Sequence, residues 1–497
     1  METFETYDYD LQTVQAARNL ARQAKVAQAQ LAKFNAEQID KIICNMVKAA
    51  EENAVSLAKL AVEETGFGKV EDKTFKNQFA STELYKFIKP MQTIGVIKDD
   101  QVNKVVEIAE PVGVLMGIIP STNPTSTVIY KSIIAIKSRN GIVFSPHPSA
   151  LKCTLAAARL MNDAAVAAGA PANIIGCISK VSMKATNELM HCDDVDMIIA
   201  TGGTAMVKAA YSAGKPALGV GPGNVPCFIE RTADISKAVK NIITSKTFDN
   251  GTICASEQSV IVEECMRDQV MEEFRRQGGY FMTPAETEQV AKNLFVRGYA
   301  MNAKMVGRSA EYIASAAGIS IPAGTKVLLG EQQGVGEGYP LSYEKLTTVL
   351  AFYTVKDWQE ACELSIKLLN NGGVGHSLSI HTQNHEMAMK FAEKPVFRIL
   401  VNTPSTQGGV GVSTGLAPAF TLGCGTWGGS ATSDNVTPLH LINKKRVAYG
   451  IKDCTENTAP SYSACGAQSG SNNAISDDEI MNVVNEVIAL LKQRGEN

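Results

Sequence analysis

The 497-residue chain has little that would point to nucleic acid, a membrane or secretion. Its formal net charge is -3 and its lysines and arginines are scattered, so no basic surface for nucleic acid is expected. The longest nearly uninterrupted apolar run, VGVLMGII at 112–119, is too short to span a bilayer. The acidic start METFETYDYD does not resemble a secretory signal. We therefore expect a soluble, cytoplasmic protein with no nucleic-acid or membrane partner.

Paired cysteines are also missing. The chain has 11 cysteines, but no two are closer than 11 positions, so there is no CxxC pair for zinc or redox chemistry. His381 and His385 are four residues apart, but HTQNH lacks the glutamate of HExxH and follows a strand pattern. We expect a solvated loop there and no metal site.

Two kinds of sequence pattern follow one another along the chain. Residues 11–87 are rich in Ala, Lys and Glu, and their apolar positions recur with helical spacing, which predicts a layer of amphipathic helices. Short apolar runs then alternate with Ala-rich helical stretches, and a second alternating region covers 236–428. This order predicts an α/β fold with parallel sheets covered by helices. The extended segments 93–110 and 438–451 alternate apolar and polar residues, as strands of a small protruding sheet would.

Glycine-rich turns offer places where backbone can approach a ligand. In DMIIATGGTAMVKAA a buried strand turns into a helix, which suits a dinucleotide pyrophosphate, although the GxGxxG fingerprint is missing and a plain turn stays possible. Further loops are GVGPGN at 219–224 and GGVGVSTG at 408–415. The second resembles a nucleophile elbow around Ser413, with Asp434 and His440 downstream. No helix pattern follows Ser413, so a serine hydrolase is disfavoured.

Cys254 in FDNGTICAS is the strongest candidate for chemistry. It lies between Asn-Gly, a turn signal, and a strand pattern, so its thiol can point into a cleft or be a buried loop residue. Upstream, GIIPSTNPTST puts Asn123 in a proline-rich turn after a buried strand. A carbonyl attacked by Cys254 would need such an amide donor, together with a backbone N–H, for its oxyanion.

Taken together, these motifs resemble the aldehyde dehydrogenase superfamily over roughly residues 10–460. FDNGTIC is similar to the family's nucleophile motif (Cys254), PSTNP to its oxyanion turn (Asn123), and YEKLTTVLAF to the strand whose glutamate, here Glu344, touches the nicotinamide ribose. ATGGT is similar to the phosphate-side turn, which implies cofactor contacts by Thr201, Gly202, Gly203 and Thr204. Gly221 is a further cofactor-binding residue that this resemblance implies.

Two departures from ordinary family members refine the expected activity. LGVGPGNVP places Val220 where hydrolytic members carry a water-activating glutamate, which resembles the CoA-acylating branch. That branch also shares SPHPSA and LGCGTWGG. We expect oxidation of a short aliphatic aldehyde, acetaldehyde or propionaldehyde, to its acyl-CoA, with a hydrolytic enzyme as the alternative. A non-catalytic scaffold is disfavoured because Cys254 and Asn123 are intact. SPHP, with Ser145 and His147, replaces the family's KPSE-like stretch, so the glutamate near the adenosine ribose that would reject a 2′-phosphate is missing. We expect NAD as the cofactor, and NADP stays possible.

The resemblance implies a division into parts. A dinucleotide-binding domain would cover 1–92 and 111–230, a catalytic domain 231–430, and an oligomerisation arm 93–110 and 431–460, giving a homodimer or homotetramer. A Gly/Ser/Asn linker follows at 466–474. Residues 475–497 have a capping-box signature and an apolar stripe, typical of an amphipathic helix. This helix resembles the encapsulation peptides that bind microcompartment shell proteins, so we expect the enzyme inside a bacterial microcompartment.

Overall fold

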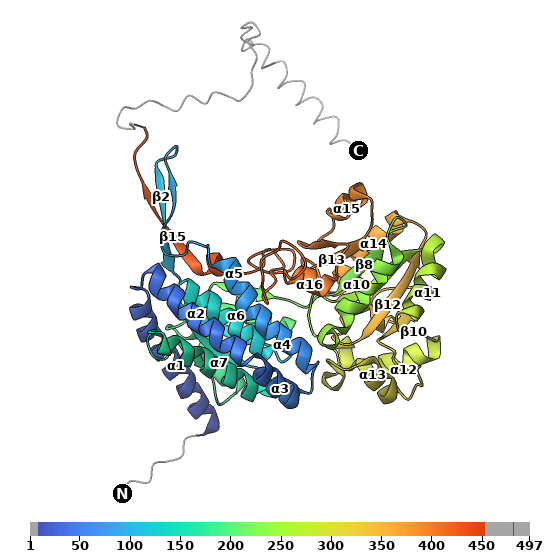
Figure 1. Ribbon diagram of the computed structural model, residues 1–497, viewed down its shortest axis with the longest axis horizontal. Coiled ribbons are helices and arrows are strands. Elements are labelled where there is room, and N and C mark those ends of the chain that lie inside the picture. The colour runs from blue at the N-terminus through green and yellow to red at the C-terminus, as the bar shows by residue number, and fades with distance from the viewer. Residues whose placement is uncertain (1–7, 453–480, 482–497) are drawn as a thin grey trace. The chain divides into compact units, whose positions relative to one another are not determined.

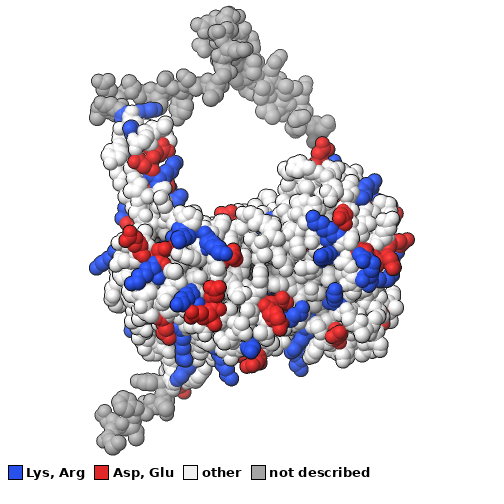
Figure 2. All heavy atoms as spheres, in the orientation of Figure 1, with Lys and Arg blue, Asp and Glu red and all other residues white. Residues whose placement is uncertain are grey.

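The computed structural model describes residues 8–452 and Met481 (Figure 1). The linker and helix predicted at 466–497 therefore lie outside the described residues, apart from Met481, as does the end of the predicted arm. None of the helices in the described part has the length and apolar character needed to cross a membrane. Acidic and basic side chains are interspersed on the face that Figure 2 shows.

Helices form the first part of the chain, as the periodicity predicts. They are α1 (Tyr9–Leu31), α2 (Ala36–Glu52), α3 (Ala54–Thr65), α4 (Val70–Gln78) and α5 (Leu84–Ile88), with a π-helical turn over Phe79–Glu83. In α2 a capping box at Asn35 and Gln38 fixes the first turn, and the apolar stripe from Ile39 to Val47 is buried. This layer covers part of the first sheet.

The first sheet is parallel, with strand order β5-β4-β3-β6-β7. Its strands are β3 (Val114–Ile119), β4 (Gly141–Pro146), β5 (Ile175–Cys177), β6 (Met197–Thr201) and β7 (Ala217–Val220). The helices that follow them are α6 (Pro124–Lys137), α7 (Leu151–Ala167), α8 (Met183–His191) and α9 (Thr204–Tyr211). Along β3, Val114 and Met116 pack with α1 and α8, whereas Leu115 and Ile119 pack with α2 and α6. Both faces are buried, which explains why the strand is apolar throughout.

The second sheet is also parallel, with strand order β10-β11-β12-β9-β8-β13-β14. Its strands are β8 (Val225–Ile229), β9 (Glu257–Glu263), β10 (Gly279–Met282), β11 (Val327–Glu331), β12 (Val349–Val355), β13 (Leu378–His381) and β14 (Ile399–Val401). The surrounding helices are α10 (Ile235–Thr247), α11 (Arg267–Arg276), α12 (Pro284–Leu294), α13 (Ala310–Ala317), α14 (Trp358–Gly372), α15 (His385–Phe391) and α16 (Ser405–Gly409). Alternate residues of β12 again face opposite apolar clusters.

The boundary predicted between the two α/β domains, after residue 230, is wrong by one strand. β8 pairs with β9 and β13 of the second sheet, so the chain passes from one sheet to the other at residues 221–224. The apolar run of β8 looks like those of the first sheet, and only its hydrogen-bond partners decide where it belongs.

A third sheet combines the two extended segments predicted from their alternation. It contains β1 (Gly95–Asp100), β2 (Val105–Pro111) and β15 (Ile442–Ala448), in the order β1-β2-β15, and β1 and β2 are antiparallel. β15 is exposed along nearly its whole length. The hairpin tip 101–104 and the described residues 448–452 belong to a unit separate from the rest, within which Tyr449 N donates to Lys104 O at 3.0 Å.

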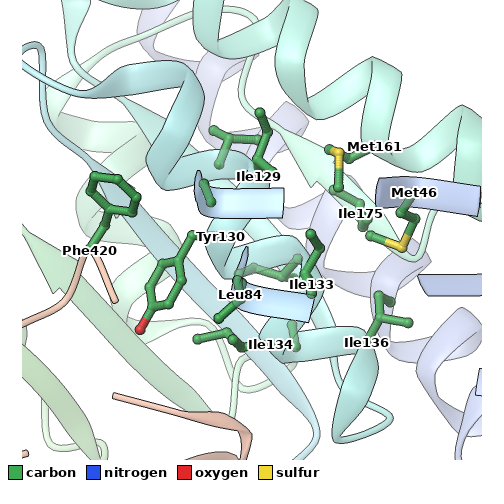
Figure 3. Close-up of a cluster of buried hydrophobic side chains, with 14 of the residues drawn as sticks. Met46, Leu84, Ile129, Tyr130, Ile133, Ile134, Ile136, Met161, Ile175 and Phe420 are labelled. Atoms are coloured by element: carbon green, nitrogen blue, oxygen red, sulfur yellow. The ribbon is translucent and has the colours of Figure 1, made fainter. Parts of the chain in front are cut away.

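Helix α6 lies at the centre of the largest apolar cluster (Figure 3). All of its 14 residues are buried, and Ile129, Ile133 and Ile136 pack among side chains of α2, α5 and α7. Tyr130 lies edge-on to Phe420 at 6.2 Å, and its hydroxyl donates to Val436 O at 2.5 Å. A helix held on every side gives a fixed position to the residue at its N-terminus, Asn123.

Candidate active site

The carboxyl ends of four neighbouring strands of the first sheet bring the predicted cofactor residues together. Strand order reverses between β3 and β6, and such a switch point is where open parallel sheets bind ligands. Asn123 lies after β3 and Gly221 directly after β7. Ser145 lies near the end of β4, and His147 is the first residue after it. Thr201 is the last residue of β6, and Gly202 and Gly203 follow it. Segments distant in sequence therefore share one edge of the sheet.

The second sheet contributes the amino ends of its strands to the same place. Because the chain passes directly from β7 into β8, this edge faces the carboxyl edge of the first sheet. Cys254 lies just before β9 and Glu344 shortly before β12. The approach is tight: a Cβ on Gly223 would lie 1.8 Å from the carbonyl oxygen of Cys254. Glycine is therefore needed at position 223.

One cavity of about 390 Å³ lies between the two sheets. Nine of the ten predicted site residues line it: Asn123, Ser145, His147, Thr201, Gly202, Gly203, Gly221, Cys254 and Glu344. Thr204, the tenth, starts α9 with an exposed side chain and is not among the lining residues. The motifs that resemble the family therefore line the same cavity.

Cys254 is half-buried as a residue and lines this cavity. The pKa of its thiol is raised to about 12, mainly by burial and then by the nearby Glu344 and Cys424, whereas Arg398 acts in the opposite direction. A buried thiolate loses hydration that the thiol does not need, so the resting side chain is the neutral thiol.

Asn123 presents its amide to the loop that carries the cysteine. Its Nδ2 donates to Thr252 O at 2.9 Å and to Thr122 Oγ1 at 3.2 Å. Its Oδ1 accepts from Lys76 Nζ at 2.6 Å. The lysine fixes which end of the amide faces Thr252, because an ammonium group can bond only to the oxygen. An N–H donor is thus held beside the loop that ends in Cys254.

The residues at the first sheet's edge fit a dinucleotide. A Cβ on Gly202, Gly203 or Gly221 would meet nothing within 4 Å, so open space lies beside this backbone. Helix α9 begins at Thr204 without a side-chain cap, which leaves its first N–H groups available to an anion. The Ser145 hydroxyl shares a hydrogen bond of 2.9 Å with Thr186, which also lines the cavity.

The cavity wall is apolar at position 220, where a hydrolytic enzyme of the resembled family would carry a carboxylate to activate water. Val220 is 3% exposed and lines the cavity at the end of β7. Glu344 is the single carboxylate among the lining residues in the described part of the chain. Burial raises its pKa to about 7, while the N–H of Gly223, at 3.0 Å from Oε1, favours the ionised form. Its carboxylate is thus fixed by backbone.

Sequence analysis missed the side chains that hold the cysteine loop. Asp249 and Asn250 both adopt left-handed backbone, with φ 49° and 51°, which costs a non-glycine residue about 1 kcal/mol or more. The Asp249 carboxylate bonds Lys73 and Lys76 from α4, and Asn250 Nδ2 donates to Gly307 O at 3.0 Å. The one sequence signal for this role was the aspartate before Asn-Gly, and by itself an Asp-Asn-Gly sequence indicates only a turn.

The residues of the two alternative sites, a serine hydrolase triad and a two-histidine metal site, do not form either site in the structure. Ser413 shares a hydrogen bond with Thr403, while both ring nitrogens of His440 are used, Nδ1 by Thr437 and Nε2 by Asp434. Serine and histidine therefore do not form a nucleophile–base pair. The expected solvated loop at HTQNH is wrong for His381, which is buried at the end of β13. No three potential metal ligands gather among the residues that the structure describes.

Comparison with known proteins agrees with this geometry. The profile of the aldehyde dehydrogenase family matches residues 4–340, and the chain belongs to that family. It is 48% identical over 435 residues to the bifunctional aldehyde-alcohol dehydrogenase AdhE of Escherichia coli K12, covering 86% of this chain and 49% of that protein. The chain thus spans about half the length of this relative.

Other matches extend over nearly the whole length of relatives that are described as acetylating enzymes. A succinate-semialdehyde dehydrogenase (acetylating) of Clostridium kluyveri is 39% identical over 447 residues, covering 90% of this chain and 97% of the relative. The crystal structure of an acetylating aldehyde dehydrogenase from Geobacillus thermoglucosidasius matches with a TM-score of 0.89 and 52% identity, covering 91% of this chain and all of that one.

Two more distant structures, each at 28% identity, are described as propionaldehyde dehydrogenases. One from Rhodopseudomonas palustris, solved with bound CoA and an acylated cysteine, has a TM-score of 0.80 and covers 87% of this chain and 97% of that one. Another, from a fucose utilisation bacterial microcompartment of Clostridium phytofermentans, has a TM-score of 0.79 and covers 91% and 99%.

Proposed function

We propose that the protein oxidises a short aliphatic aldehyde, acetaldehyde or propionaldehyde, to its acyl-CoA with NAD as oxidant, in a reversible reaction. The observation that carries this proposal is the combination of the Cys254 thiol with apolar Val220 in one cavity. A thioester formed there meets no carboxylate at position 220 to activate water. The coverage of acetylating relatives supports release by CoA.

In the proposed reaction the Cys254 thiol loses its proton to solvent water and its sulfur bonds to the aldehyde carbon, while the carbonyl π electrons move to oxygen. The amide of Asn123 and the backbone N–H of Cys254 hold this oxyanion. A bound nicotinamide supplies the acceptor for the hydride that leaves the adduct, and Thr201–Gly203, Gly221 and Glu344 would hold the cofactor. A thioester then remains on Cys254.

CoA completes the proposed cycle. Its thiolate attacks the thioester carbon, and Cys254 leaves as a thiolate that can take up a proton. The step exchanges one thioester for another, so it runs in both directions. NAD is the cofactor we propose, and NADP is the alternative because the SPHP turn lacks the glutamate of a KPSE-like stretch that would reject a 2′-phosphate. A kinetic comparison of the two cofactors decides this preference.

The hydrolytic alternative has a defined test. Mixed with aldehyde and NAD but without CoA, the enzyme should release about one NADH per active site in a burst and then nearly stop. Val220→Glu is the matched variant, since it restores a carboxylate at the cavity wall and should raise turnover without CoA. Sustained CoA-independent turnover of the wild-type enzyme, abolished in Glu344→Gln, would instead identify Glu344 as a water-activating base.

Two further proposals concern assembly. The exposed strands β1 and β15 support an oligomerisation role for the three-stranded sheet, giving a homodimer or homotetramer. For residues 475–497 we propose binding to microcompartment shell proteins and a location inside the compartment. The amphipathic sequence supports this role, as does the similarity to a microcompartment enzyme. Size-exclusion chromatography with light scattering tests the first proposal.

A further inference from the structure

A buried charged cluster lies directly behind the candidate oxyanion donor. Its members are Lys73 and Lys76 of α4, one turn apart, and Asp249 of the cysteine loop. The three side chains are 3%, 2% and 0% exposed, so water cannot satisfy their charges. Asp249 Oδ2 accepts from Lys73 Nζ at 2.8 Å and from Lys76 Nζ at 2.5 Å. Two ammonium groups thus share one carboxylate.

The charges of this cluster act on one another. Burial by itself raises the pKa of Asp249, but Lys76 and Lys73 outweigh this effect and hold it below its ordinary value. Asp249 is therefore ionised. Burial lowers the pKa of Lys76 to about 8, with Asp249 opposing the shift and Lys73 reinforcing it. A second carboxylate lies beside the cluster: Asp72 Oδ2 accepts from the Asp249 N–H at 2.7 Å, and its charge also favours the ionised form of Lys76.

The two lysines differ in what else they touch. Lys76 Nζ donates to Asn123 Oδ1 at 2.6 Å and to Thr252 Oγ1 at 3.3 Å, which links α4 to the N-terminus of α6 and to the cysteine loop. Lys73 Nζ donates its second hydrogen bond to a backbone oxygen, Thr122 O, at 2.9 Å. Lys76 is thus the member of the cluster that contacts the Asn123 side chain.

We propose that Lys76 is a positioning residue for the oxyanion donor. Its ammonium group fixes the orientation of the Asn123 amide, with Nδ2 toward the Cys254 loop, and polarises that amide so that its N–H groups donate more strongly. Positive charge behind the amide also favours negative charge in front of it. This inference rests on the proposed function, in which the oxygen of an aldehyde adduct becomes negative beside Asn123.

The test compares two variants of the full-length enzyme. Lys76→Met removes the charge and the bond to Asn123 while keeping a chain that can fill the space. We expect it to lower kcat/KM for the aldehyde about 10- to 100-fold, less than loss of the donor itself. Lys73→Met removes a charge from the same carboxylate without touching the Asn123 amide, and it should cost only about threefold or less. Lys76→Arg, which keeps the charge, should recover part of the rate.

A double-mutant cycle separates positioning from general destabilisation. If Lys76 acts through Asn123, Lys76→Met should cost only about threefold or less when Asn123 is already alanine. Equal losses in the two backgrounds, or equal effects of Lys76→Met and Lys73→Met, would overturn the proposal. Failure of the proposed function would look different, because the wild-type enzyme itself would then form no acyl-CoA.

The pH dependence gives a readout that a merely structural role would not move. The ratio of wild-type to Lys76→Met rates should fall as pH rises through about 8, because Lys76 then loses its proton. Taking the ratio cancels the titration of Cys254, which both proteins share. If Lys76→Met does not fold, the ratio of wild-type to Asn123→Ala rates should fall over the same range. A ratio that stays constant with pH contradicts the inference.

Discussion

The resting thiol of Cys254 should react slowly with alkylating agents, and its rate should keep rising well above pH 9. The pKa is raised to about 12 by burial, then by Glu344 and Cys424. At pH 7.5 such a thiol is ionised about 3000-fold less than an ordinary cysteine of pKa about 8.5. A thiolate of higher pKa is more nucleophilic, with a Brønsted coefficient of about 0.4–0.5, which recovers about 30-fold. The net expectation is a rate about 100-fold below that of an exposed cysteine.

The measurement is the pH dependence of iodoacetamide labelling of the enzyme without substrates, followed peptide by peptide by mass spectrometry. Cys44 and Cys265 are exposed and serve as references within the same molecule. Labelling of Cys254 should rise about tenfold per pH unit up to at least pH 10. Glu344→Gln removes the nearest acidic influence and should speed labelling at pH 8, where the wild-type carboxyl, with its pKa of about 7, is ionised.

Two results would refute this reasoning. One is labelling of Cys254 as fast as that of the exposed cysteines at pH 7.5, which would mean that the loop does not bury the thiol. The other is slow labelling that levels off near pH 9, which would show that access alone limits the rate while the pKa is ordinary. In either case the electrostatic description of the cavity would be wrong.

Three further predictions concern the site and the C-terminal segment. Cys254→Ala should abolish NADH formation from aldehyde and CoA with little change in thermal unfolding, and a tenth of wild-type turnover would contradict its role as nucleophile. Asn123→Ala should slow thioester formation about 10²- to 10³-fold in single-turnover assays, and a loss below about fivefold would remove it from the oxyanion site. Deleting residues 467–497 should leave these kinetics nearly unchanged but abolish co-assembly with shell proteins. A fluorescent protein fused to 467–497 that stays diffuse would contradict this last expectation.

The sequence alone was enough to predict most helices and strands and to name the candidate site residues. The apolar residues at helical spacing in α2 and the short apolar runs of β3 and β12 indicate which residues are buried. The spacing of the buried positions depends only on the geometry of the helix or strand itself. The valine at position 220 also needs no structure, since an apolar side chain cannot act as a base. Nine of the ten predicted site residues do line one cavity.

Tertiary structure decided what local pattern cannot encode. β8 belongs to the second sheet, and His381 is buried, because strand pairing and packing join residues far apart in sequence. The contact of Lys76 with Asp249, 173 positions away, has no local signature in the sequence. A lysine on a polar helix is expected to be exposed to solvent. The pKa shifts likewise follow from desolvation and charges brought together by folding. A cysteine in FDNGTIC is identifiable from sequence, but whether it rests as thiol or thiolate depends on the three-dimensional cavity around it.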